Sequence, residues 1–186
     1  MTEPNKLYVS NRQEWRQWLA ENYQSANEIW VIYPKKHSGK PRISYNDAVE
    51  EALCFGWIDS ITKGIDDDNY SQRFTLRRPR STYSQTNRER LRRLIEQEKV
   101  MPEILGTVQD VVNEPFNFPE DIKMALKANE QVWENFQSYS GSYQRIRIAY
   151  VDTARKRPEE FEKRLNNLIK KTEQGKQFGF GIEAYY

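Results

Sequence analysis

Cysteine and histidine are almost absent from this sequence of 186 residues, which holds one of each. A lone cysteine, Cys54, cannot form an internal disulfide, which is typical of a protein from a reducing compartment. A lone histidine, His37, excludes a histidine-rich metal site. A catalytic thiol at Cys54 would need an activating base, and the only imidazole belongs to a different loop. We therefore expect no metal site, no cofactor and no catalytic residues.

A strong excess of one charge and long apolar runs are also lacking. The 29 basic and 27 acidic residues leave a formal net charge of +2, which argues against a protein that coats nucleic acid through its overall charge. No stretch approaches the roughly 20 apolar residues that a membrane helix needs. Residues 1–6 are polar, unlike the apolar core of a signal peptide. We expect a cytoplasmic protein that does not insert into membranes.

The first half of the chain alternates between patterns typical of helices and of strands. Each expected helix follows a polar N-cap residue and carries apolar residues at helical spacing. Each expected strand contains β-branched and aromatic residues. Gly56 is placed to end the second helix in a left-handed turn. The expected elements are a helix over about 11–24 capped by Ser10 with Gln13, a strand over 28–33, a helix after Ser44, paired strands over 57–65 and 70–78 around a polar turn, and a helix over 85–98 capped by Ser84.

Beyond residue 100 the pattern is helical throughout. Residues 113–119 contain two prolines and no periodicity, so we expect a linker there. Helix starts are expected at Pro102, Pro119, Asn129, Ser140 or Ser142, and Pro158, and the aromatic tail from Phe178 is expected to dock back onto the body. The predicted fold class is α+β. A small antiparallel sheet with packed helices is expected in residues 1–113, and an all-helical subdomain in residues 119–186.

Arginine is concentrated at and after the second of the paired strands. Pro79 breaks that strand, so arginines and hydroxyl groups gather at its exit, just before the helix that Ser84 caps. A helix N-terminus preceded by such residues can bind phosphate or carboxylate. Asp59 would orient an arginine, and Trp57 would stack on a ligand ring. The predicted ligand site consists of Trp57, Asp59, Arg73, Arg77, Arg78, Arg80, Ser81, Ser84 and Asn87.

Other interpretations of the arginines stay open, because residues 73–93 hold eight arginines and one acidic residue, Glu89. The arginines could pair with the acidic turn at 66–68 and with Glu96 and Glu98, which would make them structural. They could also contact nucleic acid with help from interleaved aromatic rings. An enzyme with Asp59 as general base is disfavoured, because a carboxylate beside arginines is a weak base.

The central segment resembles a known protein family. Residues 48–60 read AVEEALCFGWIDS and residues 72–81 read QRFTLRRPRS. Both are similar to the signature of the YdeI/OmpD-associated family of small bacterial proteins, and residues 84–87 continue the similarity. Tyr83 stands where the family usually has tryptophan, and Leu76 where it tends to have proline. Residues 143–157 resemble the C-terminal helical segment of the family more loosely.

The resemblance implies a biological role and no particular reaction. The family is associated with protection against bacteriocins and cationic antimicrobial peptides, and it supplies no catalytic residues to carry over. We expect a non-enzymatic cytoplasmic binding protein of such a tolerance response, which holds an anionic small molecule or peptide at the arginine-rich strand exit. The alternative is a nucleic-acid-binding protein that uses the surface of residues 73–93.

Overall fold

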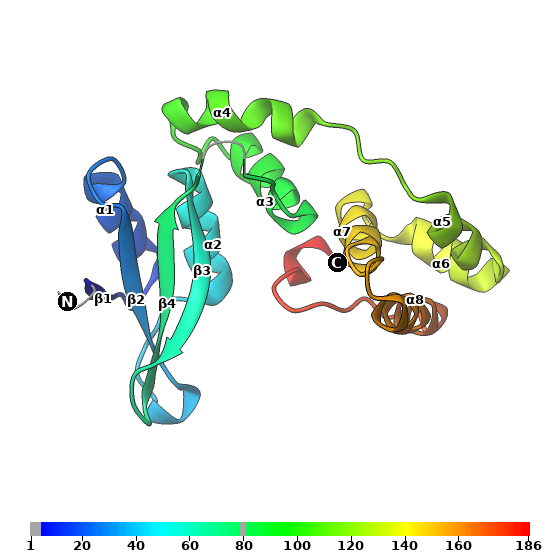
Figure 1. The fold of residues 1–186 in the computed structure, drawn as a ribbon, viewed down its shortest axis with the longest axis horizontal. Helices are drawn as coiled ribbons and strands as arrows, with labels where there is room; N and C mark the ends of the chain where they lie inside the picture. Colours follow the sequence, from blue (N-terminus) through cyan, green and yellow to red (C-terminus); the bar gives the residue numbers. More distant parts are fainter. Residues whose placement is uncertain (1–4, 79–80) are drawn as a thin grey trace. The chain divides into compact units, whose positions relative to one another are not determined.

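The computed structural model describes residues 5–78 and 81–186, which form two compact units. The first unit comprises Met1–Tyr83 and Arg90–Val112, and the second comprises Ser84–Glu89 and Asn113–Tyr186. The predicted α+β class is confirmed, because the N-terminal part holds a four-stranded sheet with helices and the C-terminal part is helical (Figure 1). The division between the units after Val112 lies at the start of the predicted linker.

The sheet of the first unit has the strand order β1-β2-β4-β3. Its strands are β1 (Lys6–Tyr8), β2 (Glu28–Pro34), β3 (Trp57–Gly64) and β4 (Asn69–Leu76). The antiparallel pairing of β3 with β4 was predicted. The antiparallel pairing of β2 with β4 and the short parallel strand β1 were not predicted. The side chain of Asp66 accepts backbone hydrogen bonds from Asp68 at 2.8 Å and Asn69 at 2.7 Å. This Asx turn closes the β3–β4 hairpin, as the polar sequence predicted.

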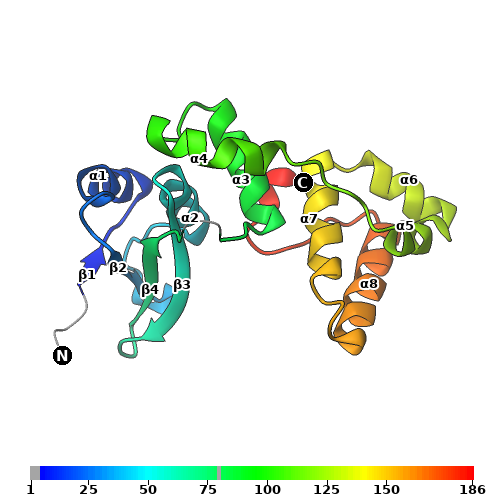
Figure 2. The same ribbon diagram turned by 45° about the horizontal axis from the view of Figure 1, so that its top comes forward.

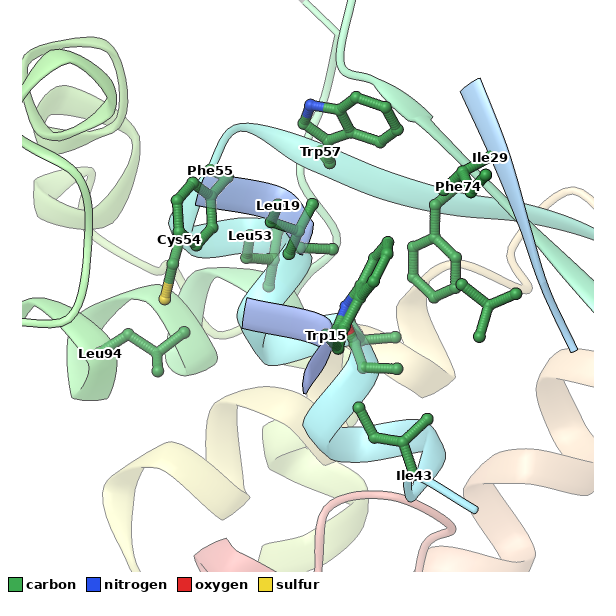
Figure 3. Packing of buried hydrophobic residues seen from close by; sticks show 14 of the residues in the cluster. Trp15, Leu19, Ile29, Ile43, Leu53, Cys54, Phe55, Trp57, Phe74 and Leu94 are labelled. Carbon is green, nitrogen blue, oxygen red and sulfur yellow. The ribbon is translucent and has the colours of Figure 1, made fainter. Parts of the chain in front are cut away.

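Two helices cover one face of this sheet, α1 (Arg12–Asn22) and α2 (Tyr45–Cys54). The Trp15 ring of α1 lies 5.2 Å from the Phe74 ring of β4, and the Trp18 ring lies 5.8 Å from the Trp57 ring of β3. Figure 3 shows Trp15, Trp57 and Phe74 among the side chains of the buried core. The first unit also contains η1 (Lys36–Ser38), the later part of α3 (Gln85–Glu96), and α4 (Pro102–Asn113) up to Val112.

The starts of α1 and α2 follow from their capping residues. The expected cap of α1 at Ser10 is wrong by one residue: the Asn11 side chain accepts the N–H groups of Gln13 and Glu14, and Glu14 reaches back to Ser10. Glu14 can reach back from the third helical position only when Asn11 is the cap. The cap of α2 at Ser44 is confirmed by its 3.0 Å hydrogen bond from the Asp47 N–H.

Gly56 ends α2 as predicted, with a positive φ of 72°. A Cβ atom at this position would lie 2.9 Å from the Ile104 side chain. Both the backbone conformation and this close approach therefore require glycine. The chain can turn directly from α2 into β3, which places Trp57 at the first strand position.

Besides the first part of α3, the second unit contains four complete helices and a short C-terminal turn. They are α5 (Glu120–Lys127), α6 (Glu130–Ser138), α7 (Gly141–Asp152), α8 (Pro158–Glu173) and η2 (Glu183–Tyr185). Figure 2 shows α7 and α8 side by side, with the tail returning to α7. The Tyr143 hydroxyl accepts the Phe178 N–H at 3.0 Å, which confirms that the tail docks back onto the helical body. Asn129 and Ser140 cap α6 and α7 as expected.

Candidate functional site at the exit of strand β4

Arg77 is the first residue after β4, and its side chain folds back over the segment that follows. Its backbone N–H donates to the Gly56 carbonyl at 2.9 Å, which fixes the strand exit against the end of α2. The guanidinium carbon lies 3.5 Å from the centre of the Tyr83 ring. Nη2 donates to the carbonyl groups of Ser81 and Thr82. The Arg77 side chain is therefore held by three residues, Ser81, Thr82 and Tyr83.

The charge of Arg77 has no carboxylate partner among the described residues. Its Nε is buried and has no hydrogen-bond acceptor in the described chain. Burial lowers the pKa of Arg77 from its ordinary value, and burial likewise raises the pKa of Tyr83. An arginine stacked on an aromatic ring and lacking a carboxylate is electrostatically suited to receive an anion.

Two further predicted residues lie in the same loop. Arg78 is exposed, and its carbonyl accepts the Ser81 hydroxyl at 2.8 Å. Ser81 is exposed as well, so its hydroxyl is close to solvent although it is already donating. Arg80 lies outside the described residues, as does Pro79. The strand exit thus brings Arg77, Arg78 and Ser81 together in one short segment.

Arg73 lies on the opposite face of β4 from the buried core. It pairs with Trp30 in the register of β2 and β4, while the next residue, Phe74, faces the helices. Its Nε donates to Glu28 at 3.0 Å, and Nη2 joins the same carboxylate. Because Glu28 neutralises Arg73, this residue contributes less free positive charge than its position in the sequence indicated.

Trp57 is 0% exposed, so neither face of its ring is open to a ligand. Its indole N–H donates to the Tyr23 carbonyl at 3.2 Å, and its ring contacts Trp18. These contacts make Trp57 part of the core, and we leave it out of the candidate site. Side chains of a strand alternate between its two faces in the same way whether the face of Trp57 is buried or binds a ligand. The sequence pattern alone therefore did not distinguish these two possibilities.

Asp59 orients a tyrosine, in contrast to the expected arginine. Its carboxylate accepts the Tyr45 hydroxyl at 2.9 Å and the side-chain amide of Gln72 at 3.4 Å. Burial, followed by the nearby Asp59 charge, raises the pKa of Tyr45 to about 12. Asp59 therefore links β3 to the start of α2, and its expected role towards the arginines is corrected.

Ser84 and Asn87 belong to the second unit and are described with it. The Ser84 hydroxyl accepts the Asn87 N–H at 3.3 Å, and the Ser84 carbonyl accepts the Arg88 N–H at 3.0 Å. These bonds confirm Ser84 as the cap of α3. The cap occupies one of the N–H groups from which an anion at this helix terminus would otherwise accept a hydrogen bond.

The remaining arginines of residues 73–93 have specific partners that lie outside the acidic turn. Arg88 pairs with Glu114 and Arg93 pairs with Glu50. Within the turn, Asp68 contacts His37 at 3.1 Å. The expected pairing of arginines with residues 66–68 is therefore corrected for these residues. Arg90 donates to Asn46 at 3.0 Å, and Arg92 donates to the Val112 carbonyl at 2.7 Å.

Cys54 is buried, as the structural interpretation of this residue predicted. Burial raises the pKa of its thiol to about 11, so the thiolate form is scarce at neutral pH. In residues 5–78 and 81–186, His, Cys, Asp and Glu side chains form no group of three or more that could hold a metal ion. No helix within these ranges is long and apolar enough to cross a membrane.

The fold defines a protein with an α+β unit and a helical unit, and comparison with family models assigns both parts. Residues 7–106 match the family described as a domain of unknown function, DUF8412, and because this match spans more than half of the sequence the chain belongs to that family. Residues 115–175 match the family described as bacteriocin-protection, YdeI or OmpD-associated, which confirms the resemblance. Searches of curated proteins and of solved structures gave no match.

The motifs that suggested this resemblance fall in two different matches. Residues 48–60 and 72–81 lie inside the first match, whereas the second match covers the C-terminal helical segment, where the similarity was looser. The association with YdeI or OmpD thus rests on the helical domain. Its description indicates a bacteriocin-protection role in general terms.

Proposed function

We propose that the protein is a non-enzymatic binding protein that holds an anionic ligand at the exit of β4 and acts in tolerance of bacteriocins or antimicrobial peptides. The observation that carries the proposal is the Arg77 guanidinium, which is stacked on Tyr83 and lacks a carboxylate partner in the described chain. The match of residues 115–175 supports the biological setting. The single, buried cysteine supports a cytoplasmic location.

The ligand proposed for this site is a small molecule or peptide that carries carboxylate or phosphate groups. A guanidinium presents several N–H donors in a plane, and this geometry matches both groups. Arg78 and Arg80 would add positive charge, and the Ser81 hydroxyl would donate to the ligand in place of the Arg78 carbonyl. Arg73 would attract the ligand only weakly, because Glu28 already neutralises its charge.

The test is a ligand screen on the full chain, with anionic metabolites, nucleotides and acidic peptides, read as a rise in thermal unfolding temperature. Any ligand found is then titrated against the Arg77→Ala/Arg80→Ala double variant, for which we expect affinity to fall at least tenfold. The matched control is Arg155→Ala/Lys156→Ala, which removes the same charge from exposed positions of the second unit. Equal affinity of the wild type and the strand-exit variant would refute the proposal.

Nucleic-acid binding through residues 73–93 is the second candidate, and the clustered arginines are the observation in its favour. The ion pairs of Arg73, Arg88 and Arg93 count against it, because neutralised arginines contribute few phosphate contacts. A titration with single-stranded DNA at increasing salt decides, since each phosphate contact steepens the loss of affinity with salt. Absence of binding at low salt would remove this candidate.

A further inference from the structure

A cavity of about 750 Å³ lies within the second unit. Its walls come from α7, α8, the C-terminal tail, and Thr86 of the α3 segment that belongs to this unit. The volume is within the range of small-molecule sites in proteins. Most of the cavity wall therefore comes from the helical domain that matches the bacteriocin-protection family, together with the tail that follows it.

Arg147 lines this cavity, and its situation is unusual for a charged residue. It is 5% exposed, and its Nε is buried without a hydrogen-bond acceptor in the described chain. Its guanidinium carbon lies 3.9 Å from the centre of the Phe178 ring and 4.6 Å from that of Tyr150. Burial lowers the pKa of Arg147. The groups that raise this pKa are tyrosine hydroxyls, and no carboxylate is among them.

Charged residues are seldom buried without a counter-charge, because the lost hydration is costly. The aromatic rings recover part of this cost through cation–π contact. They contact the guanidinium through ring faces and supply no oxygen acceptor for its N–H groups. An oxyanion in the cavity would supply that acceptor, which gives the buried arginine a function that packing alone does not explain.

Two more cations line the same cavity from α8. Arg164 lies 4.0 Å from the centre of the Tyr150 ring, and its Nε donates to Glu160 at 2.7 Å. Lys163 is exposed at the cavity wall. Three cations (Arg147, Lys163 and Arg164) and one carboxylate (Glu160) give these lining residues a formal charge of +2. A phosphomonoester carries close to two negative charges at neutral pH and is matched in charge.

The C-terminal tail packs closely against Arg147. Gly179 has a φ of 138°, and a Cβ atom there would lie 2.5 Å from the Ile182 side chain and 3.2 Å from Nη1 of Arg147. Only glycine allows the backbone to adopt this conformation so close to the guanidinium. Together with the hydrogen bond from Phe178 to Tyr143, this holds the Phe178 ring against Arg147.

We propose that this cavity is a second binding site, specific for a small phosphomonoester. Arg147 donates to the phosphate oxygens, while Lys163 and Arg164 complete the charge. The organic group of the ligand contacts the apolar wall formed by Ile146, Phe178 and Ile182. The site is independent of the strand exit, because all of its residues belong to the second unit.

The experiment is isothermal titration of the full chain with phenyl phosphate, which combines a dianionic phosphate with a small ring. We expect binding by the wild type, at least tenfold weaker binding by Arg147→Met, and about threefold to tenfold weaker binding by Lys163→Met. Lys156→Met, which removes an exposed charge from the same unit, serves as the matched control and should bind like the wild type. Phenol, which lacks the phosphate, should not bind.

A second readout separates a ligand site from a structural arginine. Phenyl phosphate should raise the unfolding temperature of the wild type, and this rise should vanish in Arg147→Met. Ligand-free Arg147→Met should be at least as stable as the wild type, because the buried unpartnered charge is gone. The proposal is overturned if Arg147→Met keeps the wild-type affinity, or if phenol binds as well as phenyl phosphate. Should Arg147→Met not fold, unchanged affinity in Lys163→Met overturns it.

Discussion

The two units of the chain treat buried charge in different ways. In the first unit, the Glu51 side chain is 2% exposed and is held by two arginines, Arg12 and Arg16. In the second unit, Glu89 is fully buried, and its carboxylate is bound by Arg145, Ser142 and Gln85. The second unit also holds Arg147, which has aromatic neighbours and no carboxylate among the described residues. The buried charge of Glu51 thus has two opposite charges beside it, whereas that of Arg147 has aromatic rings in their place.

The directions of the arginine pKa shifts follow the same division. A carboxylate raises the pKa of its arginine, as Glu89 does for Arg145. Burial alone would lower the pKa of Arg16, but its bonds to Glu51 raise it. By contrast, burial lowers the pKa of Arg77 and of Arg147. The arginines that bind buried carboxylates stabilise the fold, and Arg77 and Arg147, whose pKa burial lowers, are the ones for which we propose ligands.

The largest expected effect comes from removing Arg145, which binds the buried Glu89 through two hydrogen bonds. Arg145→Met breaks this buried ion pair, so we expect the free energy of unfolding to fall by about 3–5 kcal/mol. The measurement is urea unfolding followed by circular dichroism, combined with hydrogen exchange of the α7 amides. A loss no larger than that of Arg155→Met, an exposed arginine with two acidic partners, would show that the buried Glu89 does not depend on Arg145.

Redundancy in the first unit predicts a smaller effect of the equivalent change. Arg16→Met leaves Arg12 on Glu51, so we expect a loss of about 1.5–3 kcal/mol, typical of one hydrogen bond to a charged group. The Arg12→Met/Arg16→Met double variant should lose more than the sum of the single variants, because only then is Glu51 buried without a cation. Tryptophan fluorescence reports this unit, which contains four of the five tryptophans. Additive losses would contradict the redundancy.

The elements of the fold were predictable where local chemistry decides them. The caps at Ser44, Asn129 and Ser140 and the turn at Asp66 depend on neighbours within three residues, and all were predicted. The strand β1 was not predicted, because three residues carry little periodicity and its pairing depends on β2 more than 20 residues away. The cap of α1 was misplaced because Ser10 and Asn11 are both good capping residues.

The candidate sites were less predictable, because charge partners are distant in sequence. Arg73 meets Glu28 across 45 positions, and Arg93 meets Glu50 across 43. A count of arginines therefore overstated the free positive charge of the segment. Arg147 was overlooked because it lies among the apolar residues of α7, and its burial depends on Phe178 in the tail. An arginine inside an expected apolar stripe was the one local signal that pointed to it.

The pH dependence of unfolding tests how much the charge of one buried residue, Glu89, contributes to stability. Burial alone would raise the pKa of Glu89, but its bonds to Arg145, Ser142 and Gln85 lower it below the ordinary value. Because the folded pKa is the lower one, the ionised carboxylate contributes stability above the unfolded pKa of about 4.3, and this is lost as pH falls through the folded pKa. Glu89→Gln removes that contribution while keeping the size of the side chain.

We therefore expect Glu89→Gln to be less stable than the wild type at pH 7, with a difference that shrinks steadily between pH 5 and pH 3. Urea unfolding at each pH measures it, and Glu28→Gln provides a control at a partly exposed carboxylate whose pKa is also lowered, by Arg73. The control difference should be small throughout, because water and salt screen that pair. A Glu89→Gln difference that stays constant with pH would mean that the carboxylate stabilises the second unit by packing, without a contribution from its charge.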